Sequence, residues 1–81
     1  MKLTKTTKMI KLTTSLRETL KAQDIIRDLN IARIFDIQEE QVASNCWTFT
    51  TFEEDMEDIC LDIENMLSKS GLVEFEISFN N

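Results

Sequence analysis

The sequence predicts a small α+β fold, and three observations support this prediction. Two segments place apolar residues at helical spacing, and each begins with the Ser/Thr-x-x-Glu pattern of a capping box. Shorter segments around them are rich in β-branched and aromatic residues, as strands are. The chain has 81 residues, 42% hydrophobic and 30% charged, which suffices for one modest core. We therefore expect residues 1–81 to form a single small α+β domain, with residues 1–7 as a flexible basic arm.

The first half of the chain predicts a strand, a helix and a second strand. Residues 8–13 are rich enough in apolar side chains for a first strand. The capping box Ser15-Leu16-Arg17-Glu18 predicts the start of a helix over residues 15–29, and Asn30 is suited to end it. Residues 31–37 are rich in isoleucine and phenylalanine, which predicts the second strand.

The longest predicted element is an amphipathic helix over residues 51–71. It begins with the capping box Thr51-Phe52-Glu53-Glu54 and stops at Gly71. Its apolar residues recur at helical spacing and form one stripe toward the core: Phe52, Met56, Ile59, Cys60, Ile63 and Leu67. Before it, the polar residues 38–45 predict a turn or an extended hairpin loop, and residues 46–50 predict a third strand.

Alternation of apolar and polar residues predicts which faces of the strands are buried. Trp47 and Phe49 share one face of the third strand. In the last predicted strand, residues 73–79, the buried face consists of Val73, Phe75, Ile77 and Phe79. The element order is therefore β-α-β-β-α-β. This order resembles the ferredoxin-like split βαβ sandwich, which implies an antiparallel sheet with two helices packed on one face.

Charge is distributed unevenly along the chain. The formal net charge is −6, but residues 1–33 carry +5 and residues 34–81 carry −11. Such asymmetry steers and orients the encounter with a charged partner. Attraction between the two halves within the fold is an equally good explanation of the asymmetry alone.

The acidic half of the chain concentrates its carboxylates on the solvent face of the predicted helix 51–71. At 100° per residue, Leu61 falls nearly opposite the middle of the apolar stripe and is surrounded by carboxylates. An exposed leucine within a charged rim has the anatomy of an interaction hot spot, although single exposed apolar residues are also common. The predicted partner-binding residues are Glu54, Glu57, Asp58, Leu61, Asp62 and Glu64.

The composition excludes the commonest kinds of catalytic and metal site. There is no histidine, and the two cysteines, Cys46 and Cys60, are too few for a disulfide framework or a zinc site. The single glycine, Gly71, is assigned to a helix end and not to a phosphate-binding loop. Carboxylate pairs such as Asp58 and Asp62 lack the additional ligands that a hard cation needs. We therefore expect no enzymatic activity, no cofactor and no metal.

The aromatic residues of the third strand suggest a further alternative. Trp47, Phe49 and Phe52, followed by an acidic helix, resemble about eight residues of the third strand of RNA-recognition motifs, where aromatics stack on bases. The chain departs from that family, because Lys11 stands where the first strand should offer an aromatic and the net charge opposes a phosphate backbone. We expect Trp47 and Phe49 to face the core instead.

These observations lead to two functional hypotheses. The first is a non-enzymatic acidic interaction module, an inhibitor or regulator that binds a basic protein surface, including that of a nucleic-acid-binding protein. In size and charge alone the chain resembles phage-encoded inhibitors of host defence, anti-CRISPR proteins among them. The second is a dimeric regulatory domain of ferredoxin-like fold that binds a small ligand. With no apolar run long enough for a membrane span or signal peptide, we expect a cytoplasmic protein that contacts neither membrane nor nucleic acid directly.

Overall fold

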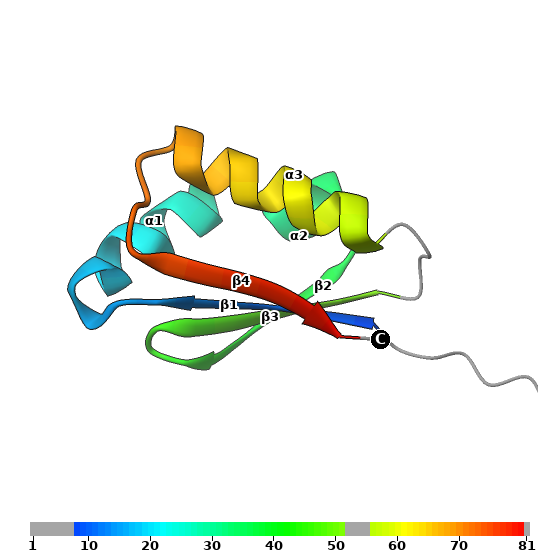
Figure 1. Cartoon of the computed structure of the whole chain (residues 1–81), viewed down its shortest axis with the longest axis horizontal. Helices are drawn as coiled ribbons and strands as arrows, with labels where there is room; N and C mark the ends of the chain where they lie inside the picture. Colours follow the sequence, from blue (N-terminus) through cyan, green and yellow to red (C-terminus); the bar gives the residue numbers. More distant parts are fainter. Residues whose placement is uncertain (1–7, 52–55, 81) are drawn as a thin grey trace, which may run out of the picture.

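The computed structural model describes residues 8–51 and 56–80, which form one antiparallel sheet with helices on one of its faces (Figure 1). The strands are β1 (Lys8–Thr14), β2 (Gln38–Ala43), β3 (Cys46–Thr51) and β4 (Phe75–Asn80), in the order β2-β3-β1-β4. The helices are α1 (Thr19–Leu29), the single turn α2 (Ile31–Ile34) and α3 (Met56–Lys69). In the part of the chain described, no helix combines the length and apolar character needed to cross a membrane. The antiparallel sheet and the helices beside it confirm the α+β prediction.

Strand register brings the apolar side chains of the central strands together on the helix-covered face. Ile10 on β1 lies opposite Phe49 on β3 and Phe79 on β4, and all neighbouring strands run antiparallel. Residues opposite one another share a face, so this row packs beneath the helices. Ile10 and Phe49 are fully buried and Trp47 is 2% exposed, which confirms the predicted inward face of the third strand.

The helices complete the core with the apolar faces that the sequence indicates. On α3, Cys60, Ile63 and Leu67 are buried and Ile59 is half-buried, so the predicted stripe is confirmed where the structure describes it. Phe52 and the side chain of Met56 lie outside the described residues. The helix ends as predicted, because Gly71 has a φ of 101°, a value that L-residues with a side chain rarely adopt.

The predicted strand over residues 31–37 is wrong, because this segment begins as the helical turn α2. Asn30 ends α1 in the left-handed conformation (φ 55°), and the buried Ile31 then starts the next turn. The amide of Phe35 donates to the carbonyl of Ile31 at 3.1 Å, so these apolar residues sit one helical turn apart and not along a strand.

The second strand lies instead where a turn or extended hairpin loop was predicted. All six residues of β2 are exposed, so no alternation of burial marks it in the sequence. It is held by antiparallel pairing with β3, with an irregularity between Gln41 and Ala43. An exposed edge strand depends on backbone pairing more than on burial, which is why composition alone assigned it to a loop.

The capping box predicted at residues 15–18 does not form. The Ser15 hydroxyl donates to Glu74 Oε1 at 2.8 Å, and the chain makes a 3₁₀ turn over Leu16–Glu18 before α1 begins. The Glu18 carboxylate accepts the backbone N–H groups of Val73, at 3.0 Å, and Glu74. Ser15 and Glu18 therefore form hydrogen bonds with the loop between α3 and β4 and do not cap the helix that follows them.

Two other predicted boundaries also shift. Thr51 is the last residue of β3, and the rest of the second predicted capping box, residues 52–54, lies outside the described residues. Val73 precedes β4 and is 74% exposed, so it does not belong to the buried face of the last strand. Phe75, Ile77 and Phe79 are half-buried against the core, which confirms the rest of that alternation.

Candidate functional site

The outward face of α3 carries the residues that the sequence singles out for partner binding. Leu61 is 53% exposed, and the neighbouring acidic side chains Glu57, Asp58, Asp62 and Glu64 are exposed as well. Around the helix, Leu61 falls between Glu57 and Asp58, opposite the buried stripe. The sixth predicted residue, Glu54, lies outside the described residues. We call the exposed set Glu57, Asp58, Leu61, Asp62 and Glu64 the acidic face of α3.

The acidic face has no compensating cation within the part of the chain that the structure describes. The ion pairs there lie elsewhere: Arg17 with Glu74 and Lys21 with Glu18, both at 3.6 Å, and Arg27 with Asp24 and Asp28, at 3.1 and 3.6 Å. Arg17, Lys21 and Arg27 are thus paired with carboxylates outside α3.

The pKa of the Cys60 thiol, which lies beside the acidic face, is raised by burial and by the negative charge of that face. Burial raises the pKa of Cys60, and the carboxylates of Glu64 and Glu57 raise it further by disfavouring a second negative charge. In the described residues, no three Asp, Glu, Cys or His side chains converge as a metal site would require.

Trp47 and Phe49, two of the three aromatic residues that resemble an RNA-recognition motif, are buried, and the third, Phe52, lies outside the described residues. Trp47 is 2% exposed and Phe49 is fully buried, because both point toward the helices. Neither ring can lie flat against a base on the open face of the sheet. This agrees with the expectation that both residues belong to the core.

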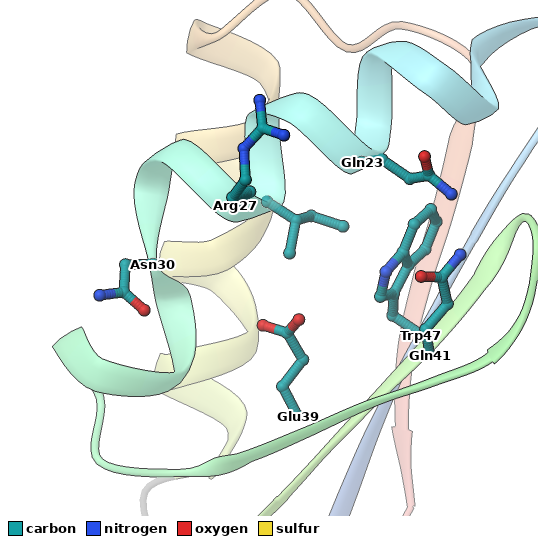
Figure 2. A pocket seen from close by; sticks show the side chains of 7 residues that line it. Gln23, Arg27, Asn30, Glu39, Gln41 and Trp47 are labelled. Atoms are coloured by element: carbon teal, nitrogen blue, oxygen red, sulfur yellow. The ribbon is translucent and has the colours of Figure 1, made fainter.

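A second candidate site, which the sequence did not reveal, is a cavity of about 460 Å³ between α1 and the β2–β3 hairpin (Figure 2). Cavities of this size accommodate small ligands. Its lining is mostly polar and consists of Gln23, Ile26, Arg27, Asn30, Glu39, Gln41 and Trp47. The sequence signal for this cavity is the two-residue spacing of Glu39 and Gln41, which places both on one face of a strand. This signal becomes informative only once residues 38–43 are known to form a strand.

Strand register explains why polar side chains reach this cavity. Glu39 lies opposite Phe49 and Gln41 opposite Trp47, so both polar residues occupy the helix-covered face of the edge strand β2. Partial burial raises the pKa of the Glu39 carboxyl, because desolvation disfavours its charged form. In Figure 2 the Glu39 carboxylate extends toward α1, and the amides of Gln23 and Gln41 lie near the Trp47 indole.

Comparison with known proteins gives no family for the chain. No protein-family model matches it, and no curated protein or solved structure is significantly similar to it.

Proposed function

We propose that this protein is a non-enzymatic interaction module that binds a basic surface of another protein through the acidic face of α3. The observation that carries the proposal is the 53% exposure of Leu61 among four exposed carboxylates. Interfaces combine an apolar contact at the centre with a charged rim, and most of their binding energy comes from a few central residues. Leu61 supplies the central contact, while Glu57, Asp58, Asp62 and Glu64 supply the rim.

The partner that fits this face best is a nucleic-acid-binding protein. Proteins that bind nucleic acids present clustered lysine and arginine side chains to the phosphate backbone. A row of carboxylates around an apolar residue occupies the same positive channel and excludes the nucleic acid, so the module acts as an inhibitor or regulator of its partner. The charge also accelerates association, and this contribution weakens as salt increases.

The experiment is capture of the partner from lysate of the native host by tagged protein at low and high salt, followed by affinity measurement with the purified partner. Leu61→Ala and Asp58→Lys should each weaken binding by ~1–3 kcal/mol, because both change exposed residues of the acidic face. Glu40→Lys is the matched control, since it makes the same charge change at an exposed residue of β2. Loss of affinity in the control alone, or unchanged affinity in both α3 variants, would contradict the proposal.

We also propose that the fold is of the ferredoxin-like type. The support is the strand order β2-β3-β1-β4 with antiparallel neighbours, together with helices on one face of the sheet. In a split βαβ arrangement, one strand is inserted between two parallel strands that a helix connects. Here β3 lies between β1 and β2, and β1 lies between β3 and β4, as two interlocked units of this kind require.

A second candidate function is that of a dimeric, small-ligand-binding regulatory domain, and the β4 edge of the sheet favours it. Among the described strands, β4 pairs only with β1. Antiparallel pairing of β4 with a second copy about Ile77 places Phe75 opposite Phe79 and Glu76 opposite Ser78, with no like charges opposed. The same operation on β2 about Glu40 opposes two identical carboxylates.

Sedimentation or light scattering tests this dimer with two substitutions at one exposed position. Ser78→Glu places a carboxylate opposite Glu76 of the second copy and should dissociate the dimer, whereas Ser78→Lys should strengthen it. A protein that is monomeric at all concentrations, or a dimer that neither substitution affects, would exclude this edge as the interface.

A further inference from the structure

The cavity between α1 and the β2–β3 hairpin offers hydrogen-bonding groups that partner binding by α3 does not use. Its volume of about 460 Å³ falls within the range of small-molecule sites. Such sites combine an apolar surface with a few polar groups that fix the orientation of the ligand. Here Ile26 and the Trp47 ring supply the apolar surface, and Gln23, Glu39 and Gln41 supply the polar groups.

Trp47 is the first observation that points to a ligand. The residue is 98% buried, and its indole N–H finds no acceptor among the residues that the structure describes. An indole nitrogen is a donor only, so a buried one ordinarily has a partner. Among the described residues, the side-chain polar atoms that are fully shielded from solvent and have no hydrogen-bond partner are the hydroxyls of Thr14 and Thr19. The indole nitrogen of Trp47 is not one of them, so it is not fully shielded from solvent. Figure 2 shows it on the cavity side of the ring.

Glu39 is the second observation. Its carboxylate extends from β2 toward α1, and no cation of the described residues forms an ion pair with it. Arg27 also lines the cavity, but its guanidinium is paired with Asp24 and Asp28 and is turned away from Glu39 in Figure 2. The cavity therefore presents one uncompensated negative charge beside several neutral hydrogen-bond donors, which favours a cationic group next to an acceptor.

We propose that this cavity binds a small α-amino acid or its amide, with the ligand ammonium on Glu39 and the ligand carbonyl or carboxylate oxygen on the indole N–H of Trp47. The amides of Gln23 and Gln41 complete the polar contacts, and the ligand side chain lies against the apolar surface. A simple amine leaves the indole N–H unpaired, and an anion without an ammonium is repelled by Glu39. This proposal goes beyond the α3 interaction module and does not depend on it.

The experiment uses the fluorescence of Trp47, which is the single tryptophan of the chain and reports the cavity directly. The probes are L-leucine, L-leucinamide and N-acetyl-L-leucine, titrated into the whole protein. L-Leucine and L-leucinamide should change the emission saturably, with a dissociation constant of roughly millimolar, as expected for ligands with few non-hydrogen atoms. N-Acetyl-L-leucine lacks the ammonium and should leave the emission unchanged at the same concentrations.

Two variants separate the site from a general effect of charge. Glu39→Gln should weaken binding of L-leucine by about tenfold, as loss of one charged hydrogen bond predicts. Glu40→Gln removes the same charge from the neighbouring residue on the other face of β2 and should retain binding. Far-UV circular dichroism establishes that both variants are folded.

The alternative explanation of Glu39 is structural, since inward-pointing charges on edge strands prevent association of sheets through their edges. In that case no ammonium probe gives a saturable change, or Glu39→Gln binds as well as the unmodified protein. Either result overturns the proposed site. Glu39→Val would then increase self-association, which light scattering measures.

Discussion

Replacement of Ile63 by alanine tests the orientation of α3, on which both the core and the acidic face depend. Ile63 is fully buried and belongs to the main apolar cluster between the helices and the sheet. The substitution removes three buried carbon atoms, worth ~2.4 kcal/mol of transfer free energy at ~0.8 kcal/mol each. The cavity left behind adds to this loss, so the free energy of unfolding should fall by ~2–5 kcal/mol. That is a large share of the ~4–12 kcal/mol expected for a chain of this length.

Urea unfolding followed by far-UV circular dichroism and by Trp47 fluorescence measures the effect. With an m-value of ~1.5 kcal/mol per molar, the midpoint should fall by ~1–3 M. Ile63→Val should cost ~0.5–1.5 kcal/mol and keeps the measurement possible if the alanine variant does not fold. The control is Leu61→Ala on the opposite face of α3, which should cost less than about 0.5 kcal/mol because surface substitutions usually do.

One result would refute the reasoning. If Leu61→Ala destabilised the protein more than Ile63→Ala, the helix would be rotated about its axis relative to the structure. The carboxylates would then not share an exposed face with Leu61, and the proposed interface would be withdrawn together with the core assignment.

Further measurements test the hydrogen bonds of Glu18, the backbone conformation of Gly71 and the burial of the two thiols. The backbone N–H of Glu74 holds the pKa of Glu18 below its ordinary value, so this contribution to stability is present above pH 4.5 and is lost as the pH falls through the lower folded-state pKa. Glu18→Gln should remove that part of the acid dependence of Tm, and an unchanged acid limb would contradict the assignment. Gly71→Ala should cost ~1–2 kcal/mol in urea unfolding, because an alanine is strained at a φ of 101°, and a neutral result would contradict that backbone conformation. Cys46 and Cys60 are buried as free thiols, so a thiol reagent should label them only as fast as the protein opens, and rapid labelling in native buffer would contradict their burial.

The elements that the sequence predicts well are those whose burial pattern is periodic. Helix α3 buries one face and exposes the other, and strand β3 buries Trp47 and Phe49 while Thr48 and Thr50 are half-buried; the spacing of Ile63 and Leu67, or of Trp47 and Phe49, reports this directly. The segment 31–43 fails for the opposite reason. Its buried residues are Ile31, in a single helical turn, and Ile37, just before β2, and all of β2 is exposed, so neither piece is long or amphipathic enough to show a period.

Hydrogen bonds between polar side chains and residues far away in the sequence also could not be predicted from the sequence. Ser15 and Glu18 match the capping-box pattern, but their partners Val73 and Glu74 are more than 50 residues away. Local pattern and tertiary contact compete for the same carboxylate, and here the tertiary contact prevails. The sequence did not predict the cavity for a similar reason, because the cavity lies between α1 and a strand, β2, that the sequence did not predict.

The two candidate sites involve different elements, and this separation has a measurable consequence. The acidic face belongs to α3, whereas the cavity lies between α1 and the β2–β3 hairpin, with no residue in common. Substitutions at separate, non-contacting sites usually have additive effects. Leu61→Ala should therefore change partner affinity equally with and without saturating L-leucine, and Glu39→Gln should leave partner affinity unchanged. If L-leucine alters partner affinity, linkage requires the partner to alter L-leucine affinity by the same factor, and the module would be a ligand-regulated one.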